Sequence, residues 1–343
     1  MTYTPRRDAP VHRLSGHRFL AVPTLVACLL ATACGAEVAE RSAEGPAPIT
    51  IDNCGQSITY PVPQRAVAYD MSSTEKMFAL GLADRMRGIV MPSTADPAVA
   101  RSPWAADYRA VETLSTDVLS REVVVDAEAD WVLAGWNSGF SEARGITPQL
   151  LNEVGIQSYQ HTESCFNYGD NPVRVPPLEA LYTDLTQIGQ IFRVEDRARQ
   201  LVADLRERAD VLRANRPEGT PARVFIYDSG TDQPFTSGGQ GAPDALVSLA
   251  GGRNIFTELP QRWTTVSWEP VVDAAPEVIA VVDYGDQPVE DKIEFLKSSP
   301  SLASSPAVQN GHFYVLDYGQ AVSGPRNIEG AEQFAKYLRS IGR

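Results

Sequence analysis

Residues able to do covalent or metal chemistry are few in this sequence and lie far apart. Two of the four histidines and one of the four cysteines fall in the first 33 residues, which leaves His161 and His312 beyond them. Two histidines without a C-x-x-C pair cannot build a three-histidine or Cys/His metal centre. The sequence therefore predicts no protein-borne metal site and no cofactor.

Motifs of common catalytic sites are missing as well. There is no G-x-S-x-G elbow, no Walker motif and no G-x-G-x-x-G that opens a helix after a strand. A Ser-His-Asp triad would need His161 or His312, and His312 opens a strand after a turn glycine, a poor place to meet a nucleophile. Composition leaves a carboxylate-dependent hydrolase open, but we expect no enzyme and no catalytic residue.

The N-terminal 33 residues have the layout of a secretory signal peptide. A stretch with four arginines precedes an apolar run at 19–33, which is interrupted by Pro23 and is too short for a bilayer span of about 20 residues. The run ends in Ala31-Thr32-Ala33-Cys34, which resembles the lipobox of bacterial lipoproteins, although alanine stands where leucine is usual. That resemblance implies a lipid on Cys34 and anchoring to the outer face of the cell membrane; an ordinary signal peptide cut near Ala33 is the alternative.

Charge and composition describe the part that follows the leader. The sequence has a formal charge of −13, and the leader's four arginines and one aspartate contribute +3, so the remainder carries about −16. A basic footprint for nucleic acid is absent, so no nucleic-acid partner is expected. Residues 34–48 are small, charged and contain proline, which predicts a flexible tether between the anchor and the folded body.

Residues 49–176 predict a first α/β lobe, because short helices alternate with strands as in a mostly parallel sheet. An opening hairpin at 49–60 places Cys54 in its turn. In an oxidising exterior, a disulfide between Cys54 and Cys165 is the default expectation.

Two further patterns concern helices. Ser72 and Glu75 fit the S-x-x-E capping box of a helix that stops at Gly81. Residues 177–216 contain almost no glycine or proline and repeat apolar residues at spacings near three and four, which predicts one long helix, or two in line with a break near Gly189. At 1.5 Å per residue, about 38 residues would span roughly 57 Å.

Residues 217–343 predict a second α/β lobe, so the helix at 177–216 would join two lobes with a ligand cleft between them. Ligands of such sheets bind at loops after the carboxyl ends of strands. These loops are rich in aromatic residues, which suits a large, partly planar, anionic ligand, and Arg326 could grip its carboxylate or phosphate. The candidate ligand-binding residues are Met71, Ser72, Ser73, Trp136, Asn137, Phe140, Phe166, Tyr168, Phe235, Arg262, Trp263, Tyr284, Tyr318 and Arg326.

Several segments in order carry a family resemblance. They are 65–75 and 79–82 in the first lobe, and 235–238, 250–256, 266–269, 275–279 and 306–314 in the second. With these segments the chain resembles the periplasmic-binding proteins of ABC importers for iron-siderophores, haem and cobalamin, the class with a rigid helix between two lobes.

The resemblance implies a function and partners. Glu142 and Glu269 match the lobe-tip glutamates that pair with arginines of the ABC permease in that family; a solvated loop charge and a helix N-terminal carboxylate are their plain alternatives. We expect a monomeric, lipid-anchored substrate-binding protein that delivers a metal chelate, foremost a ferric siderophore. A corrinoid or another bulky anionic cofactor is the alternative ligand, and a receptor that works without a transporter is the alternative class.

Overall fold

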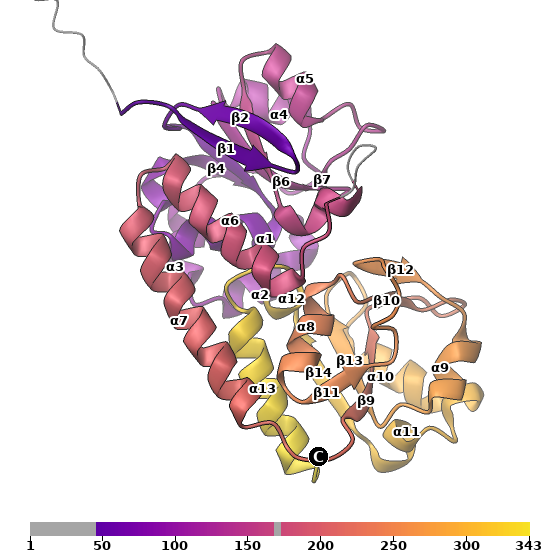
Figure 1. Ribbon diagram of the computed structural model, residues 1–343. Coiled ribbons are helices and arrows are strands. Elements are labelled where there is room, and N and C mark those ends of the chain that lie inside the picture. Colours follow the sequence, from indigo (N-terminus) through magenta and orange to yellow (C-terminus); the bar gives the residue numbers. More distant parts are fainter. Residues whose placement is uncertain (1–45, 168–172) are drawn as a thin grey trace, which may run out of the picture. The chain divides into compact units, whose positions relative to one another are not determined.

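The computed structural model describes residues 46–167 and 173–343 (Figure 1). The predicted leader, Cys34 and Tyr168 lie outside the described residues, so the lipid anchor stays a prediction. In the part that is described, no helix combines the length and the apolar character needed to cross a membrane.

A parallel sheet organises the first lobe. Its strand order is β5-β4-β3-β6, and both β7 and β8 pair with β6. The central strand β3 is apolar because both of its faces are buried: Val67 packs into one core, while Ala66 and Ala68 on either side pack into another. The strands are β3 (Ala66–Tyr69), β4 (Met86–Val90), β5 (Thr113–Ser115), β6 (Trp131–Trp136), β7 (Gly139–Phe140) and β8 (Gln157–Gln160). The helices are α1 (Asp70–Ala79), α2 (Asp96–Arg101), α3 (Ala105–Ala110), α4 (Arg121–Asp126), α5 (Pro148–Glu153) and the short η3 (Thr162–Asn167).

The expected hairpin forms from β1 (Ile49–Asn53) and β2 (Gln56–Tyr60). Its two turn residues, Cys54 and Gly55, both have positive φ, at 54° and 76°, as a type I′ turn requires. The disulfide between Cys54 and Cys165 is present as predicted, with the two Cα atoms 5.0 Å apart. It ties the hairpin to η3.

Helix α1 differs from its prediction at one end. It begins at Asp70, not after Ser72, and no side chain caps it. Asp70 itself adopts a left-handed φ of 63° and accepts a hydrogen bond from the Met71 N–H at 2.7 Å, which satisfies one backbone donor of the first turn. The predicted capping box is therefore wrong, whereas the stop at Gly81 is confirmed, because Gly81 has a φ of 70° directly after the cap residue.

Segment 177–216 contains two helices, α6 (Pro177–Ile191) and α7 (Glu195–Ala214). The helical conformation is interrupted at residues 192–194, where Arg193 has a φ of 61°. The helices pack side by side instead of in line, and Gly189 makes this possible, since a Cβ there would lie 2.4 Å from the Cβ of Ala198 (Figure 1). The helix that joins the lobes is thus α7, about 30 Å long, and the single span of 57 Å is wrong.

The second lobe repeats the plan of the first. Its parallel sheet has the order β11-β9-β13-β14, and β10 pairs with β12 in a separate antiparallel ribbon. The strands are β9 (Ala222–Tyr227), β10 (Phe235–Ser237), β11 (Gly252–Asn254), β12 (Trp263–Thr265), β13 (Val278–Asp283) and β14 (Phe313–Asp317). The helices are α8 (Ala242–Leu249), α9 (Trp268–Ala274), α10 (Val289–Ser298), α11 (Pro306–Asn310), α12 (Tyr318–Ala321) and α13 (Asn327–Ser340).

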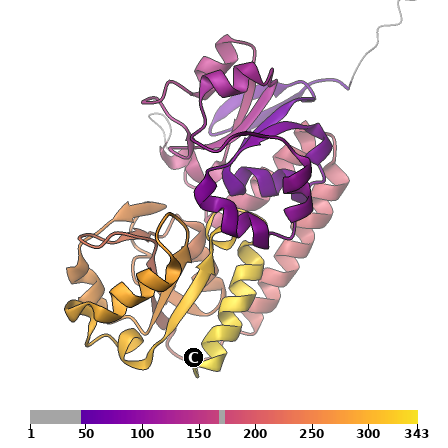
Figure 2. The same ribbon diagram turned by 180° about the vertical axis from the view of Figure 1, so that it is seen from behind.

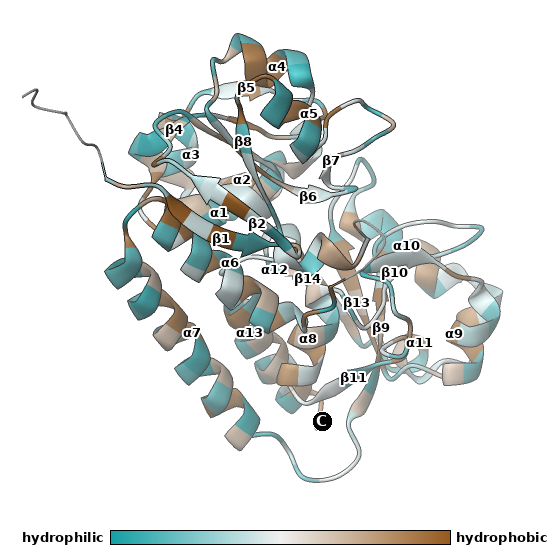
Figure 3. Ribbon diagram, turned by 45° about the horizontal axis from the view of Figure 1, so that its top comes forward, coloured by the Kyte–Doolittle hydropathy of each residue, from teal (hydrophilic) through white to brown (hydrophobic). Residues whose placement is uncertain are grey.

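One apolar core connects the inner faces of both sheets. Ala68 of β3 and Ile226 of β9 belong to the same buried cluster, together with Leu185 of α6 and Phe334 of α13. Helix α13 packs along α7 (Figure 2), and α7 turns a mixed polar and apolar surface outward (Figure 3). The two lobes are therefore joined by packed helices and not by a bare linker.

Candidate functional site

A cavity of about 480 Å³ is lined by residues from both lobes. From the first lobe, the residues come from the ends of β3 and β6 and from η3 after β8. From the second lobe they come from the ends of β9, β13 and β14 and from the segment that leads into β12. This placement agrees with the rule that open α/β sheets bind ligands beyond the carboxyl ends of their strands.

Two aromatic pairs form part of the cavity wall. Phe235 and Trp263 stack with ring centroids 5.7 Å apart, and Tyr284 and Tyr318 stack at 3.9 Å. Phe166 adds a further ring from the first lobe. Flat apolar walls of this kind can contact a bulky organic ligand over a large area.

Most of the sequence candidates line this cavity, and some do not. The lining includes Ser72, Asn137, Phe166, Phe235, Arg262, Trp263, Tyr284 and Tyr318. Met71, Ser73 and Phe140 are fully buried and lie outside the lining, since they point into the lobe core instead of the cavity. Trp136 is half-buried and also lies outside the lining, although its backbone carbonyl accepts a hydrogen bond from Arg262.

Arg326 is not available to a ligand. It is 5 % exposed and pairs with Asp317 at 3.0 Å and with Glu75 at 3.6 Å, at the contact between the two lobes. The expected anion grip by Arg326 is therefore a wrong prediction, because the guanidinium is buried and already paired with one carboxylate from each lobe.

The charged residues of the lining are mainly acidic. They are Asp70, Glu163 and Asp228, with Arg262 as the cation. Arg262 already donates to Glu163 at 3.0 Å and to the carbonyl of Trp136 at 2.9 Å. Sequence reasoning missed these acids, although Asp70 and Asp228 directly follow strands and the strand-end rule could have found them. The lining does not suit the anionic ligand that the sequence suggested.

Asp70 is the most enclosed of these acids. It is 5 % exposed, and Tyr318 donates its hydroxyl to the carboxylate at 2.5 Å. Burial raises the pKa of the Asp70 carboxyl, and the hydrogen bonds from Tyr318 and the Met71 N–H oppose that rise only in part. No cation among the described residues pairs with Asp70.

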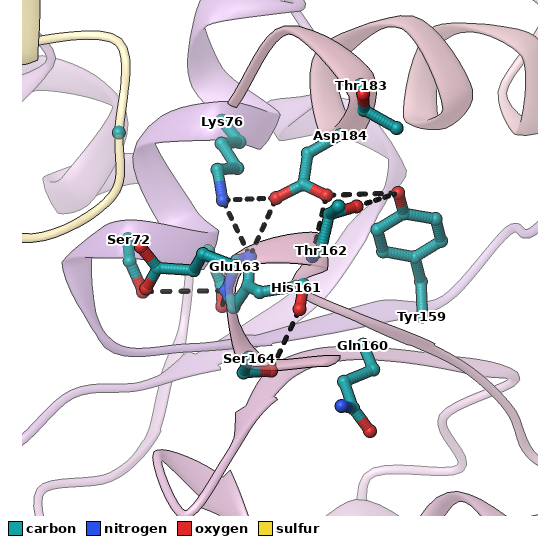
Figure 4. A network of polar contacts seen from close by, with 12 residues as sticks. Ser72, Lys76, Tyr159, Gln160, His161, Thr162, Glu163, Ser164, Thr183 and Asp184 are labelled. Carbon is teal, nitrogen blue, oxygen red and sulfur yellow. Dashed lines mark hydrogen bonds and ion pairs between the residues drawn. The ribbon is translucent and has the colours of Figure 1, made fainter. Parts of the chain in front are cut away.

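A second group of polar side chains lies in the core of the first lobe (Figure 4). Lys76 donates to His161 Nδ1 at 2.6 Å and to Asp184 at 2.7 Å, and all three side chains are nearly or fully buried. Tyr159 and the backbone N–H of Thr162 satisfy the other oxygen of Asp184, at 3.0 and 2.9 Å. Burial alone would raise the pKa of Asp184, but the charge of Lys76 holds that pKa well below its usual range.

This cluster has the residues of a Ser-His-Asp triad but not its proton arrangement. His161 Nε2 lies 2.8 Å from Ser73 Oγ and Nδ1 lies 3.3 Å from Asp184. The Lys76 ammonium has no lone pair, so Nδ1 must accept from it, and the ring proton then sits on Nε2 and points to the serine. Burial and the Lys76 charge also lower the pKa of His161. A ring in this state cannot take a proton from Ser73, so the cluster is structural.

Comparison with known proteins agrees with the geometry. The sequence profile of the periplasmic binding proteins matches residues 67–318, well over half of the chain. This chain belongs to the periplasmic binding protein family. It is 25% identical over 283 residues to a vitamin B12-binding protein of Photorhabdus laumondii, covering 82% of this chain and 90% of that protein.

Solved structures of family members share the fold. A periplasmic binding protein from Veillonella parvula superposes with a TM-score of 0.70 at 26% identity, covering 85% of this chain and 98% of that one. A protein of an ABC-type Fe3+-hydroxamate transport system from Saccharomonospora viridis also gives 0.70, at 21% identity, with 85% and 99% covered. The chain is thus a member of a family of extracytoplasmic binding proteins and not of a family of enzymes.

The two glutamates proposed for docking are exposed. Glu142 follows β7 in the first lobe, and Glu269 lies in the first turn of α9 in the second. Neither forms an ion pair with any described residue. In Figure 1, β7 and α9 lie on the side of the folded body away from α7.

Proposed function

We propose that this protein binds a ferric siderophore in the cavity between its lobes and delivers it to an ABC permease. The supporting observation is the cavity of about 480 Å³, walled by stacked aromatic pairs and reached from both lobes. This volume lies within the range of about 300–1,000 Å³ that is typical of small-molecule sites. A compact metal chelate suits it, and the bound metal is cargo, held by the chelator's own ligands.

A corrinoid is the second candidate ligand. Its support is the 25% identity to the vitamin B12-binding protein of Photorhabdus laumondii over 82% of this chain. A corrinoid is considerably larger than a trihydroxamate chelate, so it would need the lobes to stand further apart than they do here. The cavity volume therefore favours the siderophore.

A titration separates the two candidates. Trp263 lies in the cavity wall, so ligand binding should quench its fluorescence. A Trp263→Phe variant shows how much of the signal comes from this position, and mass spectrometry of protein purified from native cells identifies any retained ligand. Saturable binding of a ferric trihydroxamate supports the siderophore, saturable binding of a cobalamin alone supports the corrinoid, and binding of neither overturns the proposal.

Docking to the permease is the second part of the proposal. Glu142 and Glu269 would pair with permease arginines, and lipidated Cys34, with 34–48 as tether, would hold the protein near the membrane. Replacing both glutamates with alanine should abolish ligand uptake by cells while ligand affinity stays unchanged, and the exposed Glu207→Ala on α7 is the control. Normal uptake by the double variant would instead support a receptor that works without this docking.

A further inference from the structure

The charge of the cavity lining has a consequence for the ligand, provided the proposed metal-chelate function holds. Among the described residues, three carboxylates and one guanidinium line the cavity, and that guanidinium is already paired with Glu163 at 3.0 Å. Asp70 and Asp228 are then left without a full cationic partner in the described structure. We propose that the ligand carries a positive charge that lies against Asp70 and Asp228.

Both carboxylates act on the same part of the wall. Burial raises the pKa of the Tyr284 phenol, and the charges of Asp70 and Asp228 raise it further, which places both acids within electrostatic reach of one ring. Tyr284 stacks on Tyr318, and the Tyr318 hydroxyl is bonded to Asp70. The negative charges of two acids beside a pair of aromatic rings attract a cation and repel an anion.

A second observation points to a polar ligand at this place. Ser323 also lines the cavity; it is 2 % exposed, and its hydroxyl has no hydrogen-bond partner among the described residues. A buried hydroxyl without a partner is costly, and a polar group of the ligand would satisfy it. Asp70 is in a similar position, because a buried carboxylate without a cation is unfavourable until one arrives.

The negative charge of Asp228 is partly offset by a nearby lysine, unlike that of Asp70. Ser229 donates to Asp228 at 2.7 Å, and Lys292 acts on it from a distance while giving its hydrogen bonds to the carbonyls of Val282 and Tyr284. The Lys292 ammonium is buried and does not line the cavity, so it weakens the negative field of Asp228 without replacing a ligand cation. Asp70 should therefore contribute more to the charge preference than Asp228.

The test uses ligands that share a core and differ in charge. One series is a linear ferric trihydroxamate whose terminal amine is free, acetylated or succinylated, giving a cation, a neutral chelate and an anion of the same core. A second series, for the corrinoid alternative, is aquocobalamin below its deprotonation pH, as the cation, against neutral cyanocobalamin. In the series that binds, we expect about a tenfold fall in affinity for each unit of positive charge removed, as a charge pair in a partly buried site would give.

Conservative variants test whether Asp70 and Asp228 cause this dependence of affinity on ligand charge. Asp70→Asn keeps the acceptor for Tyr318, and asparagine tolerates the left-handed φ of 63°. Asp70→Asn together with Asp228→Asn should reduce the charge preference to within about twofold, whereas Asp273→Asn, which removes one exposed carboxylate outside the cavity, should leave it intact. Unfolding midpoints of all variants show that they remain folded.

The outcomes separate the two proposals. Equal affinity across a series, or tighter binding of the neutral or anionic member, overturns the cationic ligand while the metal-chelate function stands. A charge preference that persists in the double variant overturns the role of Asp70 and Asp228. Absence of binding in both series overturns the proposed function itself.

Discussion

Two buried carboxylates of this protein, Asp184 in the core of the first lobe and Asp70 in the cavity wall, differ in what surrounds them. Asp184 has the Lys76 ammonium at 2.7 Å, and that charge lowers its pKa despite full burial. Asp70 receives hydrogen bonds from neutral donors, and burial raises its pKa. A carboxylate that is fully paired inside the chain serves the fold, whereas one left unpaired beside a cavity has capacity for a ligand.

A third buried carboxylate, Glu75, lies further from its cation than Asp184 does. Glu75 accepts from Ser102 at 2.7 Å and has Arg326 at 3.6 Å, at the contact between the lobes. Burial raises its pKa to about 7 although the Arg326 charge opposes the rise. A cation at 2.7 Å thus lowers the pKa of Asp184, whereas burial raises the pKa of Glu75, with its cation at 3.6 Å, and of Asp70, which pairs with no described cation. Each of the three acids can be tested separately.

The largest expected effect is the loss of Lys76. In Lys76→Met, Asp184 would stay buried without its cation, which should cost about 3–5 kcal/mol in the free energy of unfolding. Urea denaturation measures this cost. A double variant that also replaces Asp184 with leucine should recover part of the loss, and a single variant within about 1 kcal/mol of the parent would show that the pair is not what stabilises this core.

The disulfide should have the next largest effect. It closes a loop with a sequence separation of 111 and holds η3, which begins beside His161 and carries Glu163 of the cavity. Replacing both cysteines with serine should lower the free energy of unfolding by about 2–4 kcal/mol, which comparison of urea midpoints checks. Unchanged stability would mean that the contact between Asn53 and Gln160 is enough to hold the hairpin.

Replacing Glu75 should have a smaller effect on stability, and that effect should depend on pH. Its pKa is raised in the folded state, so the folded protein keeps this proton to higher pH than the unfolded chain does. The contribution to stability is therefore full below about pH 4.5 and lost as the pH rises to about 7, up to about 3 kcal/mol. Glu75→Gln should remove that part of the slope in unfolding experiments between these pH values; a variant with the parent's slope would contradict the raised pKa.

Local patterns predicted the fold better than they predicted which side chains meet. The alternation of strands and helices was enough to predict two α/β lobes. The rule that ligands bind beyond the ends of strands identified Ser72, Phe235 and Tyr284 as cavity residues. The folding back of α6 on α7 depends on a close contact between Gly189 and Ala198 that periodicity does not reveal.

Polar partners that are remote in sequence were the main source of error. Arg326 looked like a ligand-binding cation because its partner Glu75 comes from the other lobe, and no spacing rule identified the nearby Asp317 as a second partner. Lys76 and Asp184 are 108 positions apart, and no spacing rule connects them. Charge pairing in this protein is a property of the tertiary structure, so it could not be read from the sequence alone.

The most direct test of the account measures stability and ligand affinity together for Asp70→Asn and Asp184→Asn. We expect Asp184→Asn to lower the free energy of unfolding by at least about 2 kcal/mol while affinity for the cationic chelate stays within about threefold. We expect Asp70→Asn to leave stability unchanged or higher and to weaken binding of that chelate about tenfold. The reverse pattern, with binding dependent on Asp184 and stability on Asp70, would contradict the division between a structural and a ligand-binding carboxylate.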